Sequence, residues 1–196
     1  MKKNSTKRED VLQKGIEILK KQGYHGTGIS DIVEATDLCS KGAFYNYFKS
    51  KEAFVLEAIE YYQLQKKDAF DFYLDDTDYP HLQRLLNLFD SLIAHYEKVT
   101  DCTQGCLVGN LSQEMGDQNE KIREVLENSS KKNIVRIGHL LEQAQKQGTL
   151  NLSRHPHHLA RFIWNSWEGA LLRMKTSKSA LDLKIFRDFL ENILLK

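Results

Sequence analysis

The sequence is poor in residues that interrupt helices and in the patterns that build strands or membrane spans. Only two prolines occur in 196 residues, Pro80 and Pro156, and no segment of useful length alternates apolar and polar residues as a half-buried strand does. No apolar run approaches the roughly 20 residues of a membrane-spanning helix. The first ten residues, MKKNSTKRED, have no apolar segment behind their charges, so no signal peptide is expected. These absences predict an all-α, cytoplasmic protein that does not associate with membranes.

Cysteine is scarce as well. Cys39, Cys102 and Cys106 are too few for the disulfide framework of a small secreted protein, and their spacing relative to the histidines does not match a zinc site. We therefore expect free thiols in a reducing compartment. The histidine-rich stretch HPHH at positions 155–158 lacks the spacing of a helical ligand pair, because its proline opens a helix inside it. No metal or other cofactor is predicted.

The net charge is only +1, but the charges are unevenly distributed. Residues 1–51 carry ten lysines and arginines against six acidic residues, whereas residues 52–196 carry 18 against 21. A basic end on a slightly acidic body is typical of a protein whose first part binds a polyanion. A chance distribution of charge on a solvated surface explains the same numbers equally well. The sequence motifs are therefore needed to distinguish these two explanations.

Apolar residues recur at intervals of three and four along almost the whole chain, which predicts helices. Thr6 and Glu9 have the spacing of a capping box at the first helix. Gly23 is a natural stop for that helix, Ser50 is suited to cap the fourth, and Pro156 suits the start of the eighth. Loops are expected at 75–80 and 100–105. The nine predicted helices lie near 7–21, 29–35, 40–47, 51–74, 81–99, 106–115, 119–147, 156–175 and 181–195.

The second and third of these helices are joined by a short turn and have the outline of a helix-turn-helix. The third lies in KGAFYNYFKSK, residues 41–51, where four aromatic rings stand between lysines. Phe44 and Phe48 lie four residues apart, have no polar group and should pack inward. Tyr45 and Tyr47 carry hydroxyl groups on rigid rings, which suit the phosphates of a DNA duplex. The alternative is a core-packed helix whose tyrosines merely lie at its edges.

The same residues resemble those of a known family. KGAFYNYF at 41–48, followed by KSKEAF at 49–54 and preceded by Ile32 and Val33, is similar to the DNA-binding segment of the TetR family of bacterial repressors. The expected number and order of helices also fit that family. The resemblance implies a homodimer that binds a double-stranded DNA operator with dyad symmetry. It implies a helix-turn-helix three-helix domain at 1–50 and a C-terminal helical ligand-sensing and dimerisation domain at 51–196.

Positions carried over from the family give a predicted DNA interface. Residues that would meet bases are either small, so that the helix can approach, or polar, so that they reach base edges; they are Lys41, Gly42, Ala43 and Asn46. Residues that would meet phosphates are Tyr45, Tyr47 and Lys51. The backbone would also be approached by Gly28 and Ser30, and Ser40 begins the reading helix. One departure is a turn at 36–40 that is one residue longer than usual and has Asp37 where glycine is expected.

The later helices would then form a sensor. Six residues are of the right type to line an apolar ligand pocket, although each alone is more simply explained as core: Tyr61, Phe89, Tyr96, Trp164, Trp167 and Met174. A second signal is GCL at 105–107. Cys106 falls where a helix begins, and the free N–H groups there stabilise a thiolate. With LSQE at 111–114, this motif resembles a branch of the family that includes sensors of electrophiles, reactive chlorine and reactive aldehydes. In that branch a lysine matching Lys175 can be the partner of the cysteine; a packed, unreactive cysteine is the alternative.

The last two helices carry more apolar surface than one side of a terminal helix needs, which predicts a four-helix dimer interface. The residues are Leu159, Ile163, Trp167, Ala170, Leu171 and Met174 on one helix, and Leu183, Phe186, Phe189, Leu190, Ile193 and Leu194 on the other. The predicted function is a dimeric repressor released from its operator by a small-molecule inducer or by modification of Cys106. A thiol-dependent enzyme and a helical interaction protein without DNA binding are the alternatives. No Cys/His pairing supports an enzyme.

Overall fold

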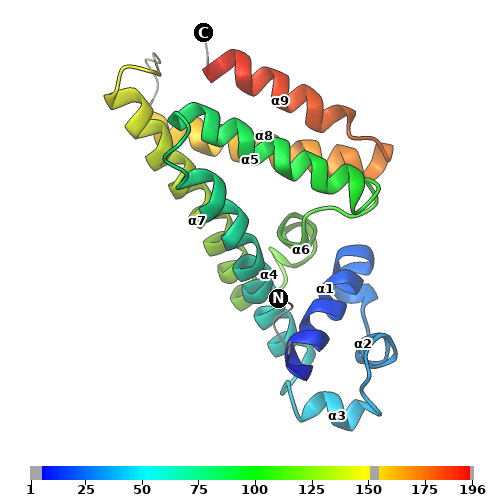
Figure 1. Ribbon diagram of the computed structural model, residues 1–196. Helices are drawn as coiled ribbons and strands as arrows, with labels where there is room; N and C mark the ends of the chain where they lie inside the picture. The colour runs from blue at the N-terminus through cyan, green and yellow to red at the C-terminus, as the bar shows by residue number, and fades with distance from the viewer. Residues whose placement is uncertain (1–5, 151–154, 195–196) are drawn as a thin grey trace. The chain divides into compact units, whose positions relative to one another are not determined.

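The computed structural model describes residues 6–150 and 155–194, and these residues form nine α-helices and no strand (Figure 1). The all-α class is therefore confirmed. None of the helices in the described part of the chain is both long and apolar enough to cross a membrane. The helices are α1 Lys7–Gly26, α2 Ile29–Ala35, α3 Lys41–Tyr45, α4 Lys51–Leu74, α5 His81–Lys98, α6 Leu107–Met115, α7 Glu120–Lys146, α8 Pro156–Ser177 and α9 Leu181–Leu194.

The helix ends follow local sequence signals. The hydroxyl of Thr6 accepts from the N–H of Glu9, and the Glu9 carboxylate accepts the N–H of Thr6 at 3.0 Å, so the capping box is formed. Gly23 interrupts α1, as predicted for a stop residue. Its φ of 74° and ψ of −173° are not helical, and only a short helical turn to Gly26 follows across the kink; glycine adopts a positive φ without steric cost. The predicted last residue of the ninth helix, Leu195, lies outside the described residues.

The chain folds into two compact units, each made of two segments. The first unit contains residues 1–65 and 107–129, and the second contains residues 66–106 and 130–196. The chain therefore passes between them within α4, within α7, and between Cys106 and Leu107. The predicted functional division at residue 50 stays a prediction.

The core of the first unit lies among α1, α2, α3 and the start of α4. Phe54 of α4 is fully buried, and Gly15 of α1 makes room for it, since a side chain at Gly15 would overlap the Phe54 ring. Arg8 of α1 forms a two-pronged ion pair with Glu57 of α4. These contacts hold α1 against the start of α4.

The core of the second unit is aromatic and joins α5, α8 and α9. The ring centroid of Phe89 lies 5.1 Å from that of Trp167 and 4.9 Å from that of Phe186. The helices α8 and α9 pack side by side (Figure 1). Arg187 of α9 donates to both carboxylate oxygens of Asp90 on α5, at 2.7 and 3.0 Å. Such a bidentate pair fixes the register of the two helices.

Candidate nucleic-acid interface and sensor site

Two phenylalanines anchor α3 to the first unit. Phe44 and Phe48 are 0% and 2% exposed, and their ring centroids lie 5.7 and 5.1 Å from that of Phe54. The guanidinium of Arg8 covers the Phe48 ring at 5.0 Å. The prediction that both phenylalanines pack inward is confirmed.

The opposite side of α3 is open to solvent. Lys41, Gly42 and Asn46 are exposed, and the Tyr45 side chain is 52% exposed although it is large and aromatic. Ala43 and Tyr47 are half-buried. The residues predicted to meet bases therefore lie together on one short helix and its C-cap, with Tyr45 beside them.

The other predicted contacts have local structural roles as well. Ser40 is the N-cap of α3 and accepts from the N–H of Ala43 at 3.2 Å. Gly28 is the N-cap of α2, and its N–H donates to the Asp31 carboxylate at 2.7 Å. Ser30 lies exposed in the first turn of α2. The long turn between the two helices contains the buried Leu38, which holds it to the core.

Lys51, predicted to meet phosphate, contacts an aromatic ring of its own unit. Its ammonium lies 4.3 Å from the centroid of the Tyr24 ring, a cation–π contact. Burial lowers the pKa of Lys51, and the carboxylates of Glu114 and Asp31 offset only part of that effect. Lys51 thus binds the end of α1 to the start of α4.

Sequence reasoning missed a carboxylate that holds α6 to the bend of α1. Glu114 accepts the backbone N–H groups of Tyr24 and His25, each at 2.6 Å. A side chain at Gly23 would overlap this carboxylate, so the glycine is required twice, for its φ and for its size. Asn110 of α6 donates to the carbonyl of Lys20 at 3.1 Å. No spacing in the sequence reveals a contact across some 90 residues.

Cys106 belongs to a buried polar cluster in the second unit. The cysteine is 7% exposed, and its thiol lies near enough to the carboxylate of Glu168 on α8 to lower the pKa of that carboxyl. Burial raises the pKa of Glu168, and the nearby Lys66 ammonium and the Cys106 thiol reverse part of that rise. Burial alone would lower the pKa of Lys66, but Tyr96, Cys106 and Glu168 together raise it. A buried thiol, a carboxylate with one fully buried oxygen and the ammonium of a half-buried lysine therefore lie close together.

Two residues of this cluster were not predicted, and the predicted partnership of Lys175 with Cys106 stays a prediction. Lys66 and Glu168 were not singled out from the sequence, because nothing in the spacing of α4 and α8 shows that they face Cys106. Lys175, the predicted partner, is half-buried near the end of α8. Cys102 is buried, and burial raises the pKa of its thiol, whereas Cys39 is exposed.

The residues predicted to line a ligand pocket are divided between the two units. Tyr61 is half-buried in the first unit. The other five are buried in the second unit, where Tyr96 and Trp167 belong to the aromatic core, with centroids 6.2 Å apart. Two buried polar atoms on one face of α8, Trp164 Nε1 and Glu168 Oε1, have no hydrogen-bond partner among the described residues.

The apolar face of α8 differs from the predicted dimer surface. The six residues predicted on α8, from Leu159 to Met174, are buried within the chain itself. The apolar side chains left exposed on α8 and α9 are Phe162, Leu172, Leu181, Ile185 and Phe189, at 45 to 66%. Only Phe189 of these was predicted. The helix stripe expected to meet a second copy instead meets α5 and α9.

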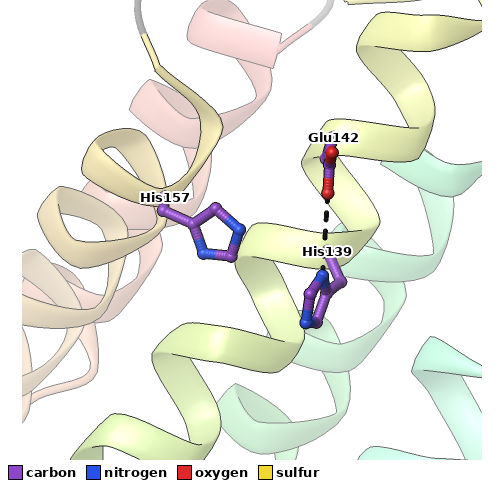
Figure 2. Close-up of side chains that lie close together, drawn as sticks. All are labelled: His139, Glu142 and His157. Carbon is purple, nitrogen blue, oxygen red and sulfur yellow. Dashed lines mark ion pairs between the residues drawn. The ribbon is translucent and has the colours of Figure 1, made fainter.

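One group of described residues could hold a metal ion. His139 and Glu142 of α7 and His157 of α8 place one ligand atom each within 4.8 Å of the others (Figure 2). The sequence prediction considered the histidines at 155–158 alone. The pair at positions 139 and 142, three residues apart on a helix, was the available signal.

Comparisons with known proteins agree over both halves of the chain. Residues 11–58 match the model of the bacterial regulatory proteins of the tetR family, and residues 81–190 match the tetracyclin repressor-like C-terminal domain. The HTH-type transcriptional repressor DhaR of Mycobacterium sp. (strain GP1) is 30% identical over 179 residues, 91% of this chain and 87% of DhaR. The crystal structure of regulatory protein TetR from Rhodobacter sphaeroides superposes with a TM-score of 0.90 at 31% identity, covering 96% of this chain and 99% of that one. The reduced form of NemR from E. coli superposes with a TM-score of 0.86 at 26% identity, covering 96% of each chain.

Proposed function

The chain belongs to the TetR family of bacterial regulatory proteins, and we propose that it is a homodimeric repressor released from its operator by modification of Cys106 or by a small-molecule inducer. Like its relatives, it is a DNA-binding transcriptional regulator. It acts in the cytoplasm, where its operator lies. A thiol-dependent enzyme and an interaction protein without DNA affinity are not favoured, because regulators match both halves of the chain.

The observation that carries the DNA-binding proposal is the exposed side of α3. Lys41 and Asn46 are the side chains that reach base edges, and Gly42 lets the helix approach the floor of the major groove. Tyr45, more than half exposed beside them, contacts phosphate. Because Lys51 covers the Tyr24 ring, we assign it mainly a structural role in supporting the reading helix. A contact with phosphate is its second role.

A dimer is supported by the apolar side chains left exposed on α8 and α9. Leu181, Ile185 and Phe189 follow one another at intervals of four on α9, so they form one stripe. Gly169 of α8 has open space around its Cα, which permits close approach of a second helix. A two-fold axis through this surface would pair each helix with its copy and bury the stripe. The two α3 helices of such a dimer would then read successive major grooves of a symmetric operator.

The sensor proposal rests on the cluster around Cys106. When the sulfur attacks an electrophile, the thiol proton can pass to Glu168, whose raised pKa makes it a stronger base than an exposed carboxylate. The ammonium of Lys66 stabilises the developing thiolate. One relative of known structure, NemR, was crystallised in what its description names a reduced form. The unpaired Trp164 Nε1 and Glu168 Oε1 support a polar inducer as the second signal.

Cys106 is also placed in the chain where its modification would be transmitted. It immediately precedes α6, and α6 holds the bend of α1 through Glu114 and Asn110. A modification that shifts the start of α6 would loosen these bonds and change the position of α2 and α3. A coupling of about 1–3 kcal/mol, typical of allosteric proteins, is enough to change operator affinity 5- to 150-fold.

Fluorescence anisotropy with a labelled duplex from the region upstream of the gene tests DNA binding. We expect an affinity that falls steeply with salt concentration, because each neutralised phosphate releases counterions. A duplex of scrambled sequence is the control for specificity. Equal affinity for both duplexes, or no dependence on salt, would refute the proposed interface.

Mass spectrometry after mild treatment with an electrophile or hypochlorite tests the sensor. We expect modification of Cys106 together with release of DNA, and no release from Cys106→Ser. The matched control is Cys39→Ser, which removes the exposed thiol and should respond as wild type. Release of DNA from Cys106→Ser by the same reagents would exclude Cys106 as the redox sensor.

A further inference from the structure

Two histidines and a glutamate converge on the surface of the second unit. His139 and Glu142 lie three residues apart on α7, so they share a face of that helix. His157 comes from the first turn of α8 and points toward them (Figure 2). One ligand atom from each residue lies within 4.8 Å of the other two. The residues are exposed or half-buried, so solvent reaches the group.

The spacing of the side chains is close to that of a metal site. His139 Nδ1 and Glu142 Oε2 are 3.7 Å apart, as the dashed line in Figure 2 marks. Two ligands of one tetrahedral zinc ion, each about 2.1 Å from the metal, lie roughly 3.4 Å apart. The His139 and His157 rings have centroids 5.3 Å apart at an interplanar angle of 86°. Small rotations of exposed side chains close the remaining distance.

The backbone around the group accommodates the His157 ring. Gly138 precedes His139, and a side chain at that position would overlap Nδ1 of the His157 ring. Any other residue at 138 would therefore push this ring away from α7. His155, the N-cap of α8, accepts the backbone N–H of His157 through Nδ1 at 3.3 Å. The first turn of α8 is thus held where it presents His157 to α7.

We propose that His139, Glu142 and His157 form a binding site for a divalent transition-metal ion of the zinc class. Two imidazoles and one carboxylate are a donor set that suits Zn²⁺, and three protein ligands leave one position for water. A carboxylate-only site would favour Mg²⁺ or Ca²⁺, but imidazole nitrogen favours zinc, cobalt, nickel or copper. The bound ion joins α7 to the start of α8. This site is separate from the proposed thiol sensor and does not depend on it.

Optical titration of the metal-free full-length protein with Co²⁺, followed by competition with Zn²⁺, tests the site. Tetrahedral Co²⁺ has visible d–d bands that reveal coordination by nitrogen and oxygen, and a thiolate ligand would add a strong near-ultraviolet charge-transfer band. We expect one ion per chain, visible bands without the thiolate band, and displacement by Zn²⁺. Circular dichroism of each metal-free variant checks that it is folded.

Three variants and one control identify the ligands. His139→Ala, Glu142→Gln and His157→Ala should each weaken binding at least tenfold. His158→Ala removes an exposed histidine beside the site and should bind as wild type. The melting temperature of the wild type should rise with Zn²⁺, and that of His157→Ala should not. No binding by the wild type, a thiolate band, or an equal loss in His158→Ala would each overturn the proposal.

Discussion

At the residue scale, the buried carboxylate of Glu168 is the group most dependent on its neighbours. One of its oxygens is fully buried although the residue as a whole is half-buried, and a thiol and an ammonium lie near it. Desolvation penalises its charged form, and the charge of Lys66 partly restores it. Removing one partner of such a pair costs more than the pair contributes, because the other charge stays buried.

Lys66→Met should therefore destabilise the protein in a pH-dependent way. Without the ammonium, the pKa of Glu168 rises further above its unfolded value. A carboxyl that holds its proton more tightly when folded loses stability as pH rises from the unfolded pKa toward the folded one. We expect a loss of about 3–5 kcal/mol at pH 8 and a smaller loss at pH 5, measured by urea unfolding.

The control for this prediction is the neighbouring lysine. Lys67→Met removes an ammonium that is 64% exposed and pairs with Asp71 on the surface. It should cost less than about 1 kcal/mol at either pH. Equal losses in the Lys66 variant at pH 5 and pH 8 would contradict a buried charge pair.

Asn46→Ala and Lys41→Ala test the assigned base contacts. Each should weaken operator binding by about 1–3 kcal/mol and relax the preference at one base pair. Lys21→Ala, which removes an exposed lysine on α1, is the control. Affinities for operators that differ at a single base pair distinguish a lost base preference from a uniform loss of affinity for DNA. An unchanged base preference in both variants would show that other residues contact the bases.

Individual residues were predictable where the signal was local. Phe44 and Phe48 could be assigned to the core because they lie four apart and have no polar atom. Lys66 and Glu168 could not be assigned, since their burial depends on the packing of helices about 100 residues apart in the chain. A lysine on an amphipathic helix is normally solvated, so the local sequence around Lys66 does not indicate that its side chain is partly removed from solvent.

At the scale of elements, the joint between α1 and α6 is the feature that a helix prediction does not contain. The carboxylate of Glu114 receives two backbone N–H groups freed by the bend at Gly23. Charge-assisted bonds of this kind contribute more than neutral ones. They fix the direction in which the chain leaves α1 and enters α2.

Glu114→Gln should loosen this joint without unfolding the protein. The loss of charge-assisted hydrogen bonds should cost about 2 kcal/mol and speed hydrogen exchange at the amides of Tyr24 and His25. DNA affinity should fall as well. Glu120→Gln, which alters a carboxylate 79% exposed in an ion pair with Arg123, should change stability by less than about 1 kcal/mol. Normal exchange at both amides would show that the joint does not depend on the charge.

The helices themselves were predicted within a few residues because apolar periodicity and caps are local. The break at Gly23 was predictable because glycine is the residue that tolerates a positive φ. The contact of Glu114 with the helical turn after Gly23 was not predictable, because it is long-range.

At the scale of the whole molecule, the exposed stripe on α9 predicts the oligomeric state. Phe189→Asp places a charge on this stripe and should convert a dimer into a monomer, as measured by sedimentation velocity. Affinity for a symmetric operator should then fall more than tenfold. The matched control is Phe72→Asp, because Phe72 of α4 is 67% exposed and Phe189 is 66% exposed. A dimer that survives in the Phe189 variant would exclude this surface.

The sequence predicted a dimer surface, but of the apolar residues left exposed on α8 and α9 it named only Phe189. Periodicity on α8 was correct for the interior of the chain, where Trp167 and its neighbours are buried. The sequence analysis did not name Phe162 and Leu172, which stay exposed on α8. The apolar residues that stay exposed to solvent can be identified only once the packing of α5, α8 and α9 is known.

The path of the chain limits how such a protein can be recombined. The segment 107–129 completes the unit that contains α1, α2 and α3, so a chimera joined at one point after α3 would inherit an incomplete scaffold for its reading helix. Faithful exchange needs three junctions, two of them inside long helices. Operator specificity and signal specificity should therefore be inherited together, and new pairings should arise by point substitution on α3 rather than by gene fusion.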